Sequence, residues 1–175
     1  MEDFRTLCCK RRSIRQFTDT PIEKDKLNYI LDCALLAPSG KRLNPWEFIV
    51  VTDRDIIKEL AGARTYGSQM MQTAMAAIVI ALDASLTDTW QADGAIAAEH
   101  ILLAAEEQGL GGCWCHIYGR EDTNSTAGGA EALVKRLCKV DEKLTVLCVI
   151  ALGYKAEERK TRELDKLPRE KVLFR

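Results

Sequence analysis

The chain has 175 residues, with 25 Lys and Arg against 26 Asp and Glu, which gives a formal net charge of −1. This length suits one buried core, so we expect a single domain over residues 1–175. The balanced charge excludes a bulk attraction to nucleic acid. No apolar run approaches the roughly 20 residues of a membrane span, and the polar start is not that of a signal peptide. We therefore expect no nucleic-acid or membrane partner.

The first third of the chain predicts two helices and a strand. Residues 4–10 favour a short helix that runs into a basic cluster at 11–15. Apolar residues recur at helical spacing over 23–36, and the sequence Pro-Ser-Gly at 38–40 ends that helix. Residues 46–51 are rich in β-branched and aromatic side chains, which indicates a strand.

The middle of the chain predicts helices around a buried strand. Asp53 is placed to cap a helix that continues to Leu60. Residues 76–82 form a short continuous apolar run, which is typical of a buried strand. Residues 93–108 carry one broad apolar band and predict the longest helix, with Gly109 as its stop signal.

The last third predicts a strand, a helix, another strand and a tail. Residues 111–118 indicate a loop that enters a strand, and residues 131–139 a helix. Residues 144–152 are a further buried strand, after which residues 153–175 become polar. About four buried strands separated by helices predict a sheet flanked by helices, of the α+β or α/β class. Pattern alone does not separate these classes.

The seven cysteines are odd in number and scattered through apolar stretches, which favours a reducing, cytoplasmic location. The sequence Cys-Trp-Cys-His at 113–116 raises the question of a metal site. A zinc site usually needs two ligand pairs, and here the only other histidine is His100. We therefore expect ordinary buried thiols and no metal.

Three segments have the composition of ligand-binding sites. The first is Arg-Arg-Ser-Ile-Arg at 11–15, because arginine binds phosphates and planar carbonyl edges through paired hydrogen bonds. Taken alone, its composition favours a solvated helix end. The second, 37–46, joins a helix stop to a strand, and an ordinary connection explains it as well. The third, 109–114, is glycine-rich and would permit close approach of a ligand. A helix precedes it, so it is not a dinucleotide-binding fingerprint.

Four motifs in order resemble those of the nitroreductase family. They are Arg-Arg-Ser-Ile-Arg-Gln-Phe-Thr-Asp-Thr-Pro-Ile at 11–22, Ala-Pro-Ser-Gly with Asn-Pro-Trp-Glu-Phe-Ile-Val-Val at 37–51, the helix end and Gly-Leu-Gly-Gly-Cys-Trp at 101–114, and Ile-Ala-Leu-Gly-Tyr-Lys-Ala-Glu-Glu at 150–158. Each motif is weak alone, but four in order cover nearly the whole chain.

The resemblance implies an α+β fold with a central mixed β-sheet flanked by helices, an intertwined homodimer, and FMN at the dimer interface. The tail at 153–175 would then pack on the partner subunit. The resemblance implies that Arg11, Arg12 and Ser13 hold the flavin phosphate and ribityl chain, and that Arg15 lies beside the N1 and O2 edge of the ring. Such a cation would stabilise the reduced flavin.

The remaining site residues follow from the same resemblance. Pro38, Ser39 and Gly40 match a loop brought by the other subunit, and Trp114, Cys115 and His116 match the segment under the ring. Arg42 stands where many members have asparagine, and would add a cation or reach solvent. In the tail, Arg162 or Lys166 would be a second phosphate ligand. No catalytic side chain is implied, since the flavin carries the chemistry.

The activity implied is a ping-pong transfer of electrons from NADH or NADPH, through FMN, to a small electron-poor acceptor such as a nitroaromatic or a quinone. Two alternatives stay open. One is a flavoprotein of the same fold that removes halogen from its substrate or fragments the flavin. The other is a flavin-binding protein without enzymatic activity.

Overall fold

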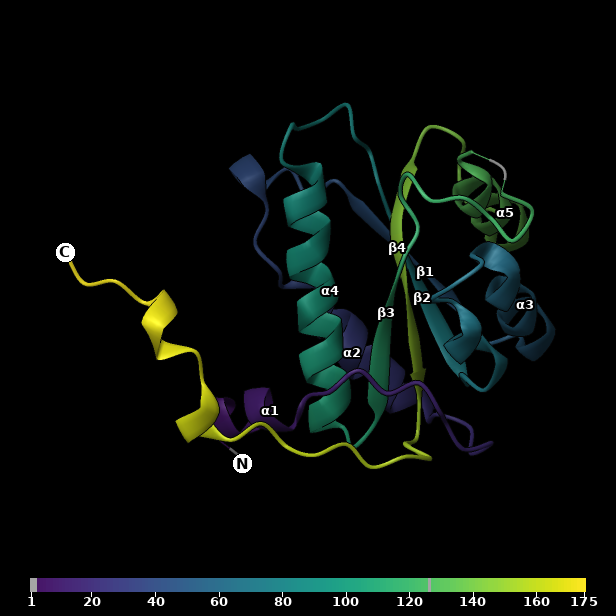
Figure 1. Cartoon of the computed structure of the whole chain (residues 1–175). Coiled ribbons are helices and arrows are strands. Elements are labelled where there is room, and N and C mark those ends of the chain that lie inside the picture. The colour runs from purple at the N-terminus through teal and green to yellow at the C-terminus, as the bar shows by residue number, and fades with distance from the viewer. Residues whose placement is uncertain (1–2, 126) are drawn as a thin grey trace.

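The structure is a computed structural model that describes residues 3–125 and 127–175. Four strands form one sheet in the order β1-β2-β4-β3, and helices cover both of its faces (Figure 1). The strands are β1 (Trp46–Val51), β2 (Ala76–Leu82), β3 (Gly111–His116) and β4 (Thr145–Gly153). The helices are α1 (Phe4–Lys10), α2 (Lys24–Leu35), α3 (Arg54–Glu59), α4 (Trp90–Glu107) and α5 (Gly129–Cys138).

Every neighbouring pair of strands in this sheet is antiparallel, so the prediction of a mixed sheet was wrong. The register places Phe48 of β1 opposite Ile80 of β2, and Val79 of β2 opposite Val149 of β4. Helices lie between consecutive strands in the sequence, a pattern that often gives parallel pairs. Here the chain passes through α3 after β1 and comes back as a strand antiparallel to β1. It likewise passes through α5 after β3 and comes back as a strand antiparallel to β3. The class is therefore α+β.

The core has two layers, one on each face of the sheet. The α2 and α4 helices pack on one face, and α3 and α5 on the other (Figure 1). The fully apolar strands β2 and β4 lie between them. The α4 helix begins at Trp90, three residues before the predicted start, and the buried Gly94 lets it approach the sheet closely. A Cβ at Gly94 would lie 2.6 Å from Leu147 Cδ2.

The segments before β1 and after β4 run side by side at one end of the sheet. Ser13 forms a parallel bridge with Gly112 of β3, and Phe17 an antiparallel bridge with Lys155. Lys155 Nζ in turn contacts Glu106 Oε1 of α4 at 2.6 Å. Residues 167–175 then extend away from the body of the molecule (Figure 1).

Candidate functional site

The basic cluster lies on an extended segment that the core holds in place. Ile14 and Phe17 are 1% and 5% exposed, and the Ile14 N–H donates to Gly112 O at 3.1 Å. Successive side chains of an extended chain point to opposite sides. Burial of Ile14 therefore turns Ser13 and Arg15 away from the core.

Glycines of the third and fourth motifs make room for this segment. A Cβ at Gly111 would lie 2.8 Å from Ile14 Cβ, and one at Gly153 would lie 2.8 Å from Phe17 Cβ. Gly109 has a φ of +76° and ends α4. The group that approaches Gly111 is thus a side chain of the same chain, where the sequence had suggested a ligand.

The beginning of the tail packs on the same segment. The Ala156 N–H donates to Gln16 O at 3.0 Å, and the Arg162 N–H donates to Cys9 O at 3.0 Å. These backbone bonds bring Arg159 and Arg162 beside the basic cluster. The beginning of the tail therefore contacts its own chain, and packing of residues 153–175 on a partner subunit stays a prediction.

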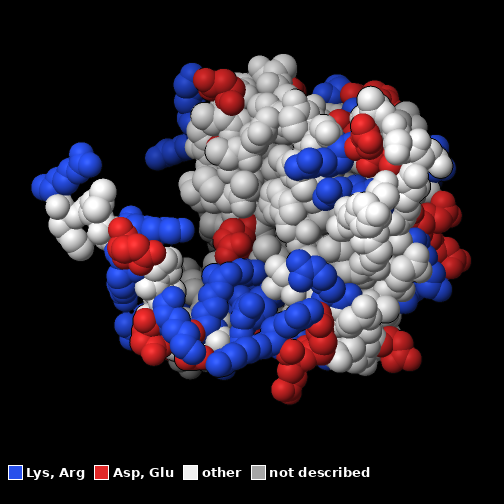
Figure 2. Space-filling model, in the orientation of Figure 1, with Lys and Arg blue, Asp and Glu red and all other residues white. Residues whose placement is uncertain are grey.

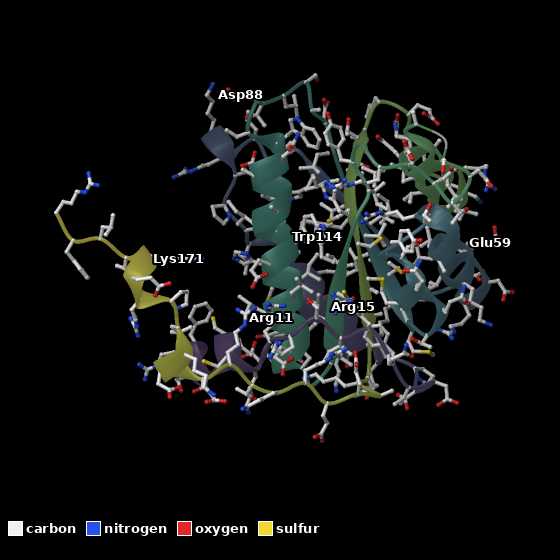
Figure 3. All side chains as sticks on the ribbon, viewed as in Figure 1. Arg11, Arg15, Glu59, Asp88, Trp114 and Lys171 are labelled. Carbon is white, nitrogen blue, oxygen red and sulfur yellow. The ribbon has the colours of Figure 1, made fainter. Side chains whose placement is uncertain are left out.

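Together the two segments enclose a cavity of about 220 Å³, here called the arginine pocket. It is lined by Arg11, Arg12, Ser13, Arg15, Arg159 and Arg162. Figure 2 shows a dense group of basic side chains at this end of the molecule, and Figure 3 shows Arg11 and Arg15 on the same side, near α4 and β3. Guanidinium groups donate hydrogen bonds in a fork that matches phosphate oxygens.

Two carboxylates hold the arginines without neutralising them. Arg11 Nε lies 3.5 Å from Glu99 Oε1, and Arg159 Nη2 lies 2.7 Å from Glu157 Oε2. Glu157 also accepts the Arg15 backbone N–H at 2.7 Å. That hydrogen bond, aided by the charge of Arg159, holds the pKa of Glu157 below its usual value. Five arginines against two carboxylates leave the arginine pocket positive.

Both predicted tail ligands, Arg162 and Lys166, line a neighbouring cavity of about 580 Å³. Arg162 also lines the arginine pocket, whereas Lys166 pairs with Glu163 at 2.6 Å. Arg159 was not predicted, because it stands in a run of charged residues with no distinctive spacing. Only the packing of the tail against residues 9–16 reveals it.

The β3 strand presents an aromatic surface on one face and thiols on the other. The rings of Trp114 and His116 are half-buried and stacked, with centroids 6.0 Å apart and planes at 14°. Cys113 and Cys115 point into the opposite layer of the core. Burial raises the pKa of Cys115 to about 12 and also raises that of Cys113, so both thiols stay protonated.

The outer edge of β3 is open for most of its length. The Gly112 carbonyl accepts a hydrogen bond across this edge. Because backbone groups alternate in direction from one residue to the next along a strand, those of Trp114 and His116 point to the same edge as those of Gly112. In the described ranges, no strand pairs with this edge beyond the bridge at Gly112. By the same alternation, the backbone groups of Cys115 point to the other side, toward Val149 of β4. Of the three residues predicted beneath the ring, Trp114 and His116 thus have backbone groups available to a ligand.

The predicted loop at 38–42 lies elsewhere in the same chain. The Gly40 N–H donates to Asp93 Oδ1 at 2.9 Å, in the first turn of α4, while Pro38 and Arg42 are exposed. Figure 3 shows Asp88, which precedes α4, at the opposite end of the helix from Arg11. One chain therefore does not bring Pro38, Ser39, Gly40 and Arg42 to the arginine pocket.

Within residues 3–125 and 127–175, no three His, Cys, Asp or Glu side chains are grouped so that they could hold a metal ion. None of the helices formed by these residues has the length and apolar character needed to span a bilayer.

Comparison with known proteins agrees with the fold and the motifs. The model of the nitroreductase family matches residues 9–65 and 62–154. A candidate NADH dehydrogenase/NAD(P)H nitroreductase of Archaeoglobus fulgidus is 37% identical over 169 residues, which cover 94% of this chain and 92% of the relative.

Solved structures give the same result. An FMN-dependent nitroreductase of Clostridium difficile R20291 has a TM-score of 0.92 and 42% identity, covering 98% of both chains. A candidate nitroreductase of Desulfovibrio desulfuricans, solved in complex with FMN, has a TM-score of 0.75 and 26% identity and covers 99% of both. From the ordered motifs, the antiparallel sheet and these matches, the chain belongs to the nitroreductase family of oxidoreductases.

Proposed function

We propose that this chain binds FMN and transfers electrons from NADH or NADPH to a small electron-poor acceptor, such as a nitroaromatic or a quinone. The observation that carries the proposal is the arginine pocket, whose Ser13 is bridged to Gly112, two residues before the half-buried Trp114. Relatives named as NAD(P)H nitroreductases and a neighbour solved with FMN support it.

The residues of the arginine pocket fit a phosphate monoester. FMN ends in a phosphate that carries close to two negative charges at neutral pH. The pocket offers five guanidinium groups and the hydroxyl of Ser13, all of them hydrogen-bond donors. Arg11, Arg12, Ser13, Arg159 and Arg162 would hold the phosphate and the adjoining chain, and Arg15, the most outward of the basic cluster, would face the ring.

The protein contributes binding and electrostatics. FMN held in this site would supply the chemistry of a two-step, ping-pong transfer of electrons from NAD(P)H to the acceptor. Arg15 holds a permanent positive charge that favours an anionic ring edge. Trp114 and His116 present a flat surface and free backbone groups on β3.

We further propose that the active form is a homodimer in which each site is shared. Within one chain, the loop at 38–42 is fixed to the first turn of α4, away from the arginine pocket. A second copy would bring its own Pro38, Ser39, Gly40 and Arg42 to that pocket. The seven free cysteines also lead us to propose a reducing, cytoplasmic location.

The first experiment is flavin binding followed by reduction. The purified protein is mixed with FMN, passed over a desalting column and examined by visible absorbance; we expect retained flavin that NADH or NADPH bleaches without air. Addition of a quinone or nitroaromatic should restore the colour. Protein that retains no FMN refutes the proposal. Retained flavin that NAD(P)H does not reduce would refute the reductase assignment alone.

A further inference from the structure

A second basic cavity lies beyond the end of β3. It has a volume of about 300 Å³ and is lined by Arg64, Thr65, Tyr66, Gly119, Arg120 and Glu121. Figure 2 shows a smaller group of basic side chains on the same face as the arginine pocket and apart from it. No role has been assigned to this cavity in the proposal above.

Among the described residues, the arginines of the second basic cavity have no acidic partner. In the part of the chain that the structure describes, no carboxylate lies within the 4.0 Å ion-pair distance of Arg64 or Arg120. Glu121 lines the same cavity without pairing to either. Two guanidinium groups facing one cavity repel each other, so an anion bound between them would be stabilised by both.

The position of Arg64 is fixed by the fold. The Ser68 hydroxyl is fully buried, accepts the Arg64 N–H at 3.2 Å and contacts Ala61 O at 2.7 Å. The guanidinium of Arg64 lies over Gly67, where a Cβ would be 3.2 Å from Nη1. The buried hydroxyl thus fixes the backbone of Arg64, and the guanidinium of Arg64 lies against Gly67.

The second basic cavity is next to the surface proposed to lie against the flavin. Burial, and then the charges of Arg120 and Arg64, lower the pKa of His116. His116 stacks on Trp114. His116 lies four positions after Gly112, which is roughly 13 Å along a strand. The aromatic surface therefore lies between the arginine pocket and the second basic cavity.

We propose that Arg64 and Arg120 bind the phosphate or carboxylate group of a reactant whose reactive part lies against Trp114 and His116. The reactant is either a nicotinamide donor with an extra phosphate or an acceptor with a carboxylate. The inference rests on the proposed function for the identity of the reactant, but the anion site itself does not require FMN.

The first test uses the two histidines as NMR probes and needs no flavin turnover. The His116 ring resonance, assigned with a His100→Gln variant, is followed during titration with adenosine 2′,5′-bisphosphate, benzoate and the uncharged benzamide. We expect at least one of the two anions to shift His116 and raise its pKa, because a bound negative charge favours the imidazolium form. Benzamide should leave the His116 resonance unchanged, and the His100 resonance should not shift in any of these titrations. The Arg64→Ala/Arg120→Ala variant should lose the shift.

The second test is kinetic and identifies the source of the anion. Donor rates are compared for NADPH and NADH, and acceptor rates for 4-nitrobenzoate and 4-nitrobenzyl alcohol. In Arg64→Ala/Arg120→Ala, KM for one charged reactant should rise about 10- to 100-fold, since a hydrogen bond to a charged group contributes roughly 1.5–3 kcal/mol. The uncharged counterpart should change little. Arg64→Lys should retain part of the effect, and Arg136→Ala, exposed on α5, is the matched control.

The outcomes separate the two proposals. A larger KM for NADPH alone supports a donor phosphate, and one for 4-nitrobenzoate alone supports an acceptor carboxylate. Unchanged selectivity together with no anion-dependent shift of His116 overturns the anion site even if FMN turns over normally. Loss of FMN binding with an intact His116 response refutes the proposed function and leaves the anion site supported.

Discussion

The arginine pocket and the second basic cavity are both positive, but their arginines are held differently. In the arginine pocket, Arg11 and Arg159 pair with Glu99 and Glu157. In the second basic cavity, Arg64 and Arg120 have no such partners among the described residues. Fixed ion pairs reduce the ordering needed when a ligand binds. We therefore expect the first cavity to suit a resident cofactor and the second a reactant that must leave.

The packing beneath the two cavities also differs. The arginine pocket is built by two segments far apart in sequence, residues 9–16 and 155–162, which meet through backbone hydrogen bonds. The second basic cavity is built from the loop before β2 and the turn after β3. Loss of tail packing should therefore affect FMN retention more than it affects Arg64 and Arg120.

The largest expected effect is on FMN affinity. Arg11→Ala removes a half-buried cation from the arginine pocket and leaves Glu99 unpaired. FMN affinity should fall roughly 10- to 100-fold, the equivalent of one charged hydrogen bond. Equilibrium dialysis or flavin fluorescence measures it. Arg120→Ala should bind FMN as the native chain does; equal losses in both variants would erase the distinction between the cavities.

Mixing two variants tests whether each site is shared by two chains. A Cβ at Gly40 would meet Thr89 Oγ1 at 2.6 Å, so Gly40→Val should displace the loop. Arg11→Ala and Gly40→Val homodimers should each retain little FMN. After unfolding and refolding together, a mixed dimer would hold one intact site, and roughly a quarter of all sites should recover. No recovery, with mixed dimers verified by mass spectrometry, would argue for sites contained within one chain.

A smaller effect is expected on stability and on the position of the basic cluster. Gly111→Ala forces a Cβ against Ile14, and overpacking of this kind costs about 1–3 kcal/mol. Urea unfolding should show that loss, together with weaker FMN binding. Gly62→Ala is the control, because no atom lies within 4 Å of its Cβ position. Unchanged FMN affinity in a destabilised Gly111→Ala would show that the arginine pocket tolerates movement of Ile14.

Arg15→Ala should make the potential of bound FMN more negative, because a cation near the ring stabilises its reduced form. An exposed charge contributes about 1 kcal/mol, which is on the order of 20 mV for a two-electron couple. Spectroelectrochemistry against a reference dye measures the shift. Arg12→Ala serves as a comparison, since it should lower affinity with a smaller change of potential. Equal reduction potentials of bound FMN in the native protein and in Arg15→Ala would contradict a position of Arg15 beside the flavin ring.

The smallest effect is expected on the alkylation of the β3 thiols, Cys113 and Cys115, which lie between the two cavities. Cys113 and Cys115 are buried, and the pKa of Cys115 is raised to about 12. A neutral alkylating reagent at pH 8 should therefore modify only the half-buried Cys8, Cys9 and Cys33 in the folded protein. Peptide mass spectrometry identifies the labelled sites. Rapid labelling of Cys115 would show that β3 opens.

Local patterns in the sequence specified most of the elements, because their period and end signals are local. Asp53 caps α3 by accepting from the Asp55 and Ile56 N–H groups, as predicted. Gly109 ends α4, and the apolar runs at 76–82 and 144–152 became β2 and β4. The predictions failed where distant segments meet. The direction of a strand depends on the path of the connection that precedes it, and no local sequence pattern specifies that path.

The same division holds for the site. The sequence by itself determined the family, through four ordered motifs, and it marked Arg11, Arg12, Ser13 and Arg15 as a group. Only the tertiary structure brought Arg159 and Arg162 into the arginine pocket and placed Arg64 and Arg120 near His116. The reason is physical: side chains far apart in sequence become neighbours only when buried residues such as Ile14 and Phe17 fix the segments that carry them.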